Sequence, residues 1–412
     1  MVNEQSKRLR FLKLRINGHP LFKDGTEFSV FSSSKVSPDN DENVYNLHRN
    51  FYHNKVEALV GKNATGKTTL MKLTIGILDL LISSRDQIIE STDLRDSLRV
   101  PNSTNMEVYF YATDGFVIKD AISFKFKEDR ELKRGRWVIS SEKIYKKKIS
   151  TIYSKSTFFD FDDEKHLEKN RTDFPYYPNS ASIFKNVIGD YYAQPVSNDL
   201  MFTNVNGLFV YGEENIPTEL LEFIDPSIEY FKVCTESSED GRERQYYRLK
   251  FKGNPKEIIE NNMLKLSLLL SSGTQKAISL YDKVVTTLKT GGILFIDEIE
   301  NHFNAEILSE FIGFFVNPEI NIYGAVLIFS THYSELLDYD YLTRRDSVYI
   351  ASRKGTQVDV SRYSDLNVRP DYSKSSVFKA SVQRPTAPSY EAQMRLISYT
   401  KELVRGANEN AK

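Results

Sequence analysis

The sequence contains very little cysteine: Cys234 is the only one among 412 residues. A single cysteine cannot form a disulfide within the chain, which is typical of proteins in a reducing cytosol. The N-terminal residues lack the apolar core of a signal peptide. No uninterrupted apolar run approaches the ~20 residues that a membrane-spanning helix requires. These absences predict a cytoplasmic protein with no membrane partner.

The chain also lacks an excess of charge of either sign. Its 55 Lys and Arg residues and 56 Asp and Glu residues leave a formal net charge of −1. Such a balance gives no overall attraction to nucleic acid, so any nucleic-acid contact must come from a local patch. The length is too great for one ordinary core and suits a large α/β domain with a substantial insertion.

The strongest motif is a glycine-rich run of nine residues that fits the pattern G-x-x-x-x-G-K-[ST]. In this pattern, backbone N–H groups surround the phosphates of a nucleotide, the lysine reaches the β- and γ-phosphates, and the hydroxyl binds Mg²⁺. A short apolar strand over 55–60 precedes the run, and a helix follows it with its N-terminus toward the anion. We therefore predict that ATP and Mg²⁺ bind through Gly61, Asn63, Ala64, Thr65, Gly66, Lys67, Thr68 and Thr69.

A second motif joins an apolar strand to two acids. The run 293–296 is entirely apolar, as expected of a buried parallel strand, and Asp297 and Glu298 follow it at the edge where open α/β sheets bind ligands. We predict that Asp297 holds Mg²⁺ together with Thr68, and that Glu298 polarises the attacking water. The alternative is a pair of surface acids at the end of a strand.

A histidine and a serine-rich run complete the set. The next apolar strand, 325–329, is followed by Ser-Thr-His, so His332 is predicted to contact the γ-phosphate and to act with Glu298 and Lys67 in catalysis; the alternative is a structural histidine. The run over 270–275 opens the helix before the two acids. Its small residues offer exposed N–H groups to a phosphate, which makes Ser271, Ser272 and Gly273 further candidates.

Alternating apolar strands and amphipathic helices predict a parallel sheet that is covered on both faces. We divide the chain into an N-terminal lobe (1–100), an insertion (101–265), a C-terminal lobe (266–352) and a tail (353–412). The expected elements are strands at 8–17, 28–32, 55–60, 293–296, 325–329 and 347–351, helices at 69–83, 277–288 and 307–315, and hairpins turning at Asp114-Gly115 and near Asp240-Gly241.

The stretch 125–148 is locally basic, with ten Lys or Arg against four Asp or Glu, and Trp137 and Tyr145 lie within it. Basic residues interleaved with aromatics are typical of a contact with nucleic acid or a partner protein. The alternative, which composition favours, is a solvated face of a hairpin.

Taken together, the phosphate loop, the run "LSSGTQKA", the acids in "DEIENHFN" and His332 resemble the motifs of ABC-class ATPases. They are most similar to the RecF/SMC/OLD-like branch, including the AAA-15/AAA-21 ATP-binding proteins of bacterial anti-phage defence and toxin–antitoxin systems. The resemblance covers about residues 8–115 and 225–352. It implies an ABC-type P-loop ATPase head with a mixed or parallel sheet, and a largely β/α insertion between the phosphate loop and the signature.

In that branch ATP is bound between two subunits. The resemblance implies that Ser271, Ser272 and Gly273 would touch the γ-phosphate of ATP bound by a second copy, and that Glu300, Asn301 and His302 would form the D-loop of a homodimer, which could assemble further. An adenine-stacking Tyr45 or Phe51, and Asn105 as a Q-loop residue, are weaker candidates, since aromatics more often pack in the core.

Three functions fit the motifs. The first is an ATPase that controls a separately encoded effector, such as a nuclease, because the roughly 60 residues after the last expected strand are too few for the nuclease domain of OLD proteins. The second is a DNA-repair-type ATPase that holds DNA through 125–148. The third, a transporter ATPase, is disfavoured because the signature lies roughly 200 residues after the phosphate loop.

Overall fold

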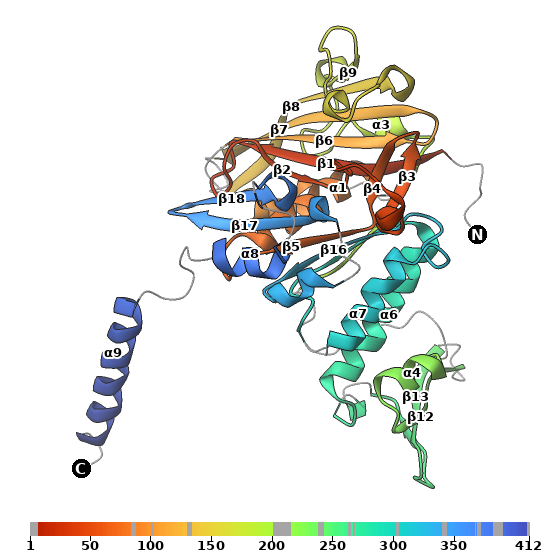
Figure 1. Cartoon of the computed structure of the whole chain (residues 1–412), viewed down its shortest axis with the longest axis vertical. Coiled ribbons are helices and arrows are strands. Elements are labelled where there is room, and N and C mark those ends of the chain that lie inside the picture. The colour runs from red at the N-terminus through yellow and green to blue at the C-terminus, as the bar shows by residue number, and fades with distance from the viewer. Residues whose placement is uncertain are drawn as a thin grey trace.

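The computed structural model describes most of the chain, in thirteen stretches: 7–83, 88–99, 103–129, 134–200, 216–237, 243–262, 265–266, 268–301, 305–339, 344–366, 368, 372–381 and 390–409. Two large sheets dominate the fold. Figure 1 shows the seven-stranded sheet above the six-stranded sheet, with helices α6 and α7 beneath the second one.

The six-stranded sheet carries the motifs. Its order is β11-β15-β16-β5-β17-β18, and every neighbouring pair is parallel except β17 and β18. Strands β5, β15 and β16 are buried along their whole length, as their largely apolar sequences predict, although β5 also buries Glu57 and β16 ends in Ser330 and Thr331. The strands are β5 (Val56–Val60), β11 (Val196–Asp199), β15 (Ile293–Ile296), β16 (Val326–Thr331), β17 (Val348–Lys354) and β18 (Gln357–Arg362).

The seven-stranded sheet is antiparallel apart from the β1–β10 pair. It joins strands from both sides of the phosphate loop, because β1 pairs directly with β6 and β2. Its strands are β1 (Arg8–Asn17), β2 (Thr26–Ser29), β6 (Thr104–Ala112), β7 (Phe116–Asp129), β8 (Arg134–Lys148), β9 (Leu167–Asn170) and β10 (Tyr192–Ala193).

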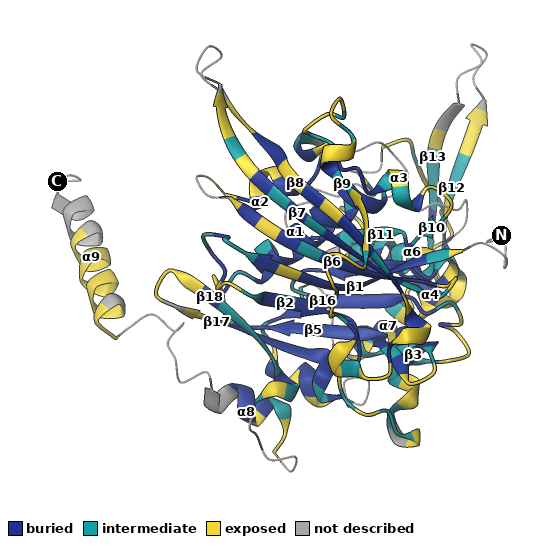
Figure 2. Cartoon of the chain, turned by 90° about the horizontal axis from the view of Figure 1, so that it is seen from above, coloured by how far each residue is buried: buried dark blue, intermediate teal, exposed yellow. Residues whose placement is uncertain are grey.

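Helix α1 (Lys67–Ile82) is packed between the two sheets. Its apolar side chains share one core with β1, β6 and one face of the six-stranded sheet. Helices α6 (Ser272–Thr290), α7 (Ala305–Val316) and α8 (Lys374–Ser381) share a second core with the opposite face. The prediction of a parallel sheet covered on both faces is therefore confirmed, as is the α/β fold class (Figure 2).

Smaller elements complete the described chain. A three-stranded sheet is formed by β12, β13 and β14, beside helix α4, and helix α9 exposes apolar side chains such as Leu396. The bounds are β3 (Val44–His48), β4 (Phe51–Asn54), α2 (Leu94–Ser97), α3 (Lys185–Ile188), α4 (Thr218–Ile224), β12 (Ile228–Ser237), β13 (Glu243–Phe251), β14 (Ile258–Glu260) and α9 (Tyr390–Glu409).

Most of the predicted elements are present. The first strand, both hairpins and the helices around the motifs are confirmed, although the second strand lies earlier, at Thr26–Ser29. The turn near Asp240-Gly241 lies outside the described residues. Among the helices of the described ranges, none is both long and apolar enough to cross a membrane.

Candidate functional site

The glycine-rich loop connects the C-terminal end of β5 to the N-terminus of α1. Glycine is required at two of its positions. A Cβ atom at Gly61 would lie 2.6 Å from the carbonyl oxygen of Ala351 in the neighbouring strand β17. Gly66, the residue before α1, has φ of +81°, which only glycine adopts readily. The loop is thus held closely against β17.

Lys67 lies inside this loop. Its Nζ atom donates to the carbonyl oxygens of Gly61 (2.7 Å) and Lys62 (3.0 Å) and lies 3.3 Å from Nδ1 of His332. Burial lowers the pKa of Lys67 to about 8, although the nearby carboxylates oppose this effect. A buried ammonium group beside the N-terminus of a helix can bind the phosphates of a nucleotide.

Thr68 and Asp297 meet across the site. The Thr68 hydroxyl donates to Oδ2 of Asp297 at 2.7 Å, and Ser330 donates to Oδ1 at 2.5 Å. Asp297 follows β15 and Thr68 lies in the first turn of α1, so the contact joins the two predicted metal-binding residues across the site. A hydroxyl beside one carboxylate suits Mg²⁺, which usually takes one or two protein oxygens, phosphate oxygens and water. These residues therefore fit the ion.

Glu298 has a dense set of contacts. Its Oε1 atom lies 3.1 Å from Nε2 of His332, and its Oε2 atom accepts a hydrogen bond from Nδ2 of Asn301 at 2.8 Å. Partial burial raises the pKa of Glu298, but the His332 and Asn301 hydrogen bonds outweigh it, and the net pKa lies below the ordinary value. Its φ of +49° is rare for a residue other than glycine and is a feature of functional sites.

Lys67, Thr68, Glu298 and His332 border one cavity of about 330 Å³, and Asp297 lies behind Thr68 without lining it. The sequence motifs did not reveal three of its lining residues: Leu21, Arg99 and Arg353. The Arg353 guanidinium donates to the carbonyl oxygen of Ala64 at 3.3 Å. No spacing in the sequence links Arg353 to the loop, because strand pairing alone brings them together. The cavity is lined by Leu21, Asn63, Ala64, Thr65, Gly66, Lys67, Thr68, Thr69, Arg99, Glu298, His332 and Arg353.

The serine-rich run lies elsewhere. Neither Ser271 nor Gly273 is among the described residues that line this cavity. Ser271 is the N-cap of α6, and its hydroxyl accepts the backbone N–H of Thr274 at 3.0 Å. Helix α6 continues into β15 through a tight turn, so its N-terminus lies toward the sheet edge where Asp297 lies. Of the expected D-loop, Glu300 accepts the backbone N–H of His332 at 2.7 Å, and His302 lies outside the described residues.

The weaker candidates are placed away from the phosphate loop. Phe51 is buried in a core with Phe31 and Phe158, and both Phe51 and Tyr45 belong to the β3–β4 hairpin at the opposite end of β5. They are therefore excluded as adenine-stacking residues. Asn105 does not line the cavity.

The basic stretch 125–148 forms parts of β7 and β8. Trp137 and Tyr145 are each 3% exposed, so neither can stack on a base; Trp137 packs in the core of α1, and Tyr145 lies against Phe161 and Lys119. Its exposed basic residues are Lys125, Lys127, Arg136, Lys143 and Lys148.

The phosphate loop, the acids after β15 and the buried parallel sheet together form a candidate P-loop nucleotide site. A family model described as an AAA domain, putative AbiEii toxin of a Type IV toxin–antitoxin system, matches residues 240–338. This match contains Asp297, Glu298 and His332, and it supports the expected resemblance to AAA-21 ATP-binding proteins.

A solved structure of the recombination mediator protein RecF, from the RecFOR pathway, is similar at a TM-score of 0.36 and 10% identity. The similarity covers 87% of this chain and 100% of that chain. Among curated proteins no sequence matches significantly.

Proposed function

We propose that this protein hydrolyses ATP between two copies of the chain and uses ATP-dependent dimerisation to control a separately encoded effector. The observation that carries the proposal is the convergence of Lys67, Thr68, Asp297, Glu298 and His332 on one edge of the sheet. These are the groups that phosphoryl transfer to water requires: a phosphate cradle, a metal site and an acceptor for the proton of water.

Each group has a role. Lys67 and the loop N–H groups bind the β- and γ-phosphates. The phosphate oxygens then take the place of the carbonyl oxygens of Gly61 and Lys62 as acceptors for Lys67. Thr68 and Asp297 would hold Mg²⁺, which neutralises charge on the phosphates when bound. Glu298, whose lowered pKa keeps it ionised at neutral pH, orients the attacking water and accepts its proton. His332 holds that carboxylate toward the loop.

The proposal of a dimer is supported by the surface around the signature. Ser271 and Gly273 do not line the cavity of their own chain. Leu268 and Leu269, immediately before the signature, are 86% and 49% exposed. Adjacent exposed leucines favour a protein contact. We propose that this surface meets the phosphate loop of a second copy, so that Ser271, Ser272 and Gly273 complete the nucleotide site.

The role in anti-phage defence through a nuclease or toxin effector is supported by the matched family, whose description names a toxin of a toxin–antitoxin system. Purification of the protein with ATP, with the product of a neighbouring gene expressed alongside it, tests this part. Retention of that product on the ATP-bound protein is the expected result, and its loss from the Lys67→Ala variant would show that ATP is required.

The ATPase itself is tested by three variants. Glu298→Gln should lower kcat by at least about 100-fold while ATP still binds, because the proton acceptor is removed and the phosphate cradle is kept. Lys67→Ala should abolish ATP binding. Glu306→Gln, which changes an exposed carboxylate of α7, should behave as the wild-type protein. Hydrolysis by Glu298→Gln at the wild-type rate would refute the role of Glu298.

A DNA clamp is the alternative function. The exposed lysines and arginines of β7 and β8 could contact phosphates. Trp137 and Tyr145 are buried, so this surface lacks the exposed aromatic side chains on which bases of single-stranded nucleic acid stack. DNA-stimulated hydrolysis that weakens steeply with salt, and is lost on Lys127→Gln, would favour this function.

A further inference from the structure

A second cavity, of about 650 Å³, lies at the seam between the two large sheets. Strand β2 forms one wall, β18 forms another, and the segment at 155–159 lies across them. Its volume falls in the range of small-molecule sites, about 300–1,000 Å³. It has no described lining residue in common with the cavity at the phosphate loop, so the two are separate sites.

Three cations line this cavity: Lys13, Lys155 and Arg362. Lys13 is paired, with Nζ at 3.3 Å from Oε1 of Glu27. Lys155 forms no ion pair with any described residue, and its Nζ atom donates to the carbonyl oxygen of Ser34 at 2.6 Å. Lys155 therefore brings a positive charge to the cavity without a direct counter-ion.

Arg362 is the second incompletely paired cation. Its side chain is 10% exposed, its Nη2 atom donates to the carbonyl oxygen of Ser29 at 2.6 Å, and its Nε atom is buried with no hydrogen-bond partner in the described structure. The nearest carboxylate in an ion pair with it, Glu57, is 3.8 Å away. A buried donor without a partner calls for an explanation, and a bound anion is one.

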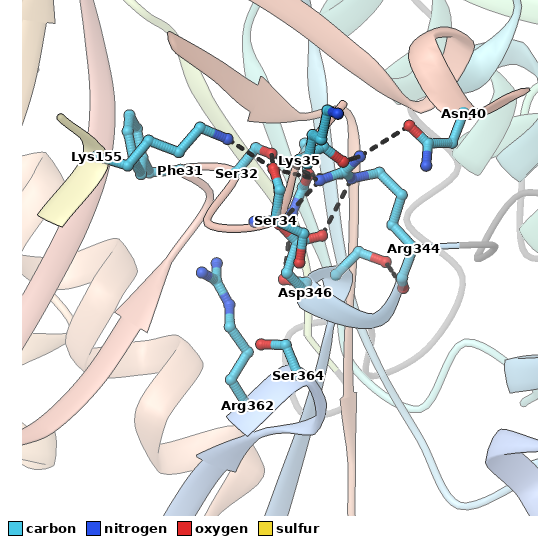
Figure 3. A network of polar contacts seen from close by, with 12 residues as sticks. Phe31, Ser32, Ser34, Lys35, Asn40, Lys155, Arg344, Asp346, Arg362 and Ser364 are labelled. Carbon is cyan, nitrogen blue, oxygen red and sulfur yellow. Dashed lines mark hydrogen bonds and ion pairs between the residues drawn. The ribbon is translucent and has the colours of Figure 1, made fainter. Parts of the chain in front are cut away.

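The neighbouring carboxylates do not neutralise this charge. Burial raises the pKa of Glu57 to about 8, against the effect of Arg362, so Glu57 is largely uncharged at neutral pH. Asp346 is already bound by Arg344, whose Nη2 atom lies 3.0 Å from Oδ2. Figure 3 shows Lys155 and Arg362 approaching this Arg344–Asp346 pair from different elements. Glu27 and Asp365 also line the cavity, so its lining holds three cations against two carboxylates.

The wall also includes aromatic and hydroxyl side chains. Phe159 is half-buried, its ring lies 5.1 Å, edge to face, from that of Phe31, and Nζ of Lys13 lies 4.0 Å from its centroid. Ser33, Ser156 and Ser361 line the cavity between the charged and aromatic groups. An aromatic surface beside two cations suits a ligand that joins a planar ring to a phosphate.

We propose that this seam cavity binds a mononucleotide, with its phosphate at Lys155 and Arg362 and its base against Phe159. The strands that line it also support the phosphate loop. Tyr349 and Arg362 line the cavity, while Ala351 in β17 and Val358 in β18 pack against Gly61 and Gly66. A ligand here would therefore contact the hairpin on which the ATP site rests.

Isothermal titration of AMP and of GMP into the full-length Lys67→Ala variant tests the proposal, because that background removes binding at the phosphate loop. One of the two nucleotides should bind saturably at one site. Adding Lys155→Gln should weaken this binding by at least about tenfold, since a charge-assisted hydrogen bond to the phosphate is lost. Adding Glu27→Gln, which removes a negative charge from the same wall, should strengthen it.

The affinity should fall in Lys155→Gln and rise in Glu27→Gln. A loss of structure would instead lower the affinity in both variants, so the two explanations are distinguishable. Lys155 is chosen because it is partly exposed, whereas Arg362 also holds β2 through Ser29. Absence of saturable binding of both nucleotides to Lys67→Ala, binding that Lys155→Gln leaves unchanged, or weaker binding in Glu27→Gln would overturn the proposal. None of these outcomes depends on ATP hydrolysis.

Discussion

The Nε2 atom of His332 lies 3.1 Å from the Oε1 atom of Glu298, in a bond between the ends of two adjacent parallel strands. On its other side, the imidazole Nδ1 atom lies 3.3 Å from Nζ of Lys67. The same Nδ1 atom lies 2.9 Å from the carbonyl oxygen of Gly61, so the ring contacts the phosphate loop on one side and the carboxylate on the other. His332 thereby connects the phosphate loop to Glu298.

Replacement of His332 tests this connection. His332→Ala should lower kcat by about 10- to 100-fold, because Glu298 loses the donor that holds it toward the loop. His332→Gln keeps an amide donor and should retain part of the activity. ATP affinity should change little in both variants, since the phosphates are held mainly by Lys67 and the backbone. Equal activities of His332→Ala and the wild-type protein would contradict this role.

Thr68 should determine the requirement for magnesium. Thr68→Ala removes the hydroxyl that lies 2.7 Å from Asp297, so the Mg²⁺ concentration for half-maximal ATP binding should rise by about tenfold or more. Thr68→Ser keeps the hydroxyl and is the matched control. ATP binding measured over a magnesium titration gives both values, and identical curves for Thr68→Ala and Thr68→Ser would show that the hydroxyl does not bind the ion.

Glu57 should make stability fall as pH rises. Burial raises its pKa from 4.5 to about 8, so the folded protein holds a proton that the unfolded chain has released between these values. Relative to Glu57→Gln, the wild-type free energy of unfolding should therefore decrease by at least about 1 kcal/mol between pH 5 and 8. Urea denaturation at the two pH values measures this, and Glu219→Gln, on an exposed site of α4, should keep the wild-type pH dependence. A constant difference between wild type and Glu57→Gln would contradict it.

The Arg344–Asp346 pair should stabilise the contact between the two sheets. Its side chains are 1% and 0% exposed, and Asp346 also accepts the backbone N–H of Ser34 at 2.7 Å (Figure 3). Asp346→Ala leaves Arg344 buried without its partner, which typically costs about 3–5 kcal/mol of unfolding free energy. Asp96→Ala breaks an exposed pair with Arg95 and should not change stability measurably. Similar denaturation midpoints for the two variants would show that the buried pair is not needed.

The sequence predicts the central sheet well because short apolar runs such as 293–296 are typical of buried strands, and the phosphate loop, the two acids and His332 each follow a buried strand. Gly291, in the left-handed conformation, ends α6, which extends beyond the expected range of 277–288 at both ends. The pairing of β1 with β6 was not predictable, because nothing local shows that strands from both sides of the phosphate loop join one sheet. The same holds for the site residue Arg353, which strand β17 brings to the loop.

Composition alone does not show which residues of the stretch 125–148 are exposed, whereas their burial in the fold does. Trp137 and Tyr145 lie within a basic stretch, yet their side chains alternate inward while several lysines alternate outward. The contact between Asp346 and Ser34 joins residues 312 positions apart, and no periodicity indicates it. Sequence motifs thus identify most of the residues that line the cavity at the phosphate loop, whereas the seam cavity depends wholly on tertiary contacts.

The mass of the Glu298→Gln variant in solution tests the shared nucleotide site most directly. With ATP and Mg²⁺, light scattering during size-exclusion chromatography should give twice the chain mass of 47.6 kDa, and without nucleotide it should give a single chain. Adding Ser272→Arg should prevent the increase while each chain still binds ATP. A mass of 47.6 kDa with ATP bound to every chain, or a dimer that Ser272→Arg does not affect, would contradict a site formed by two copies.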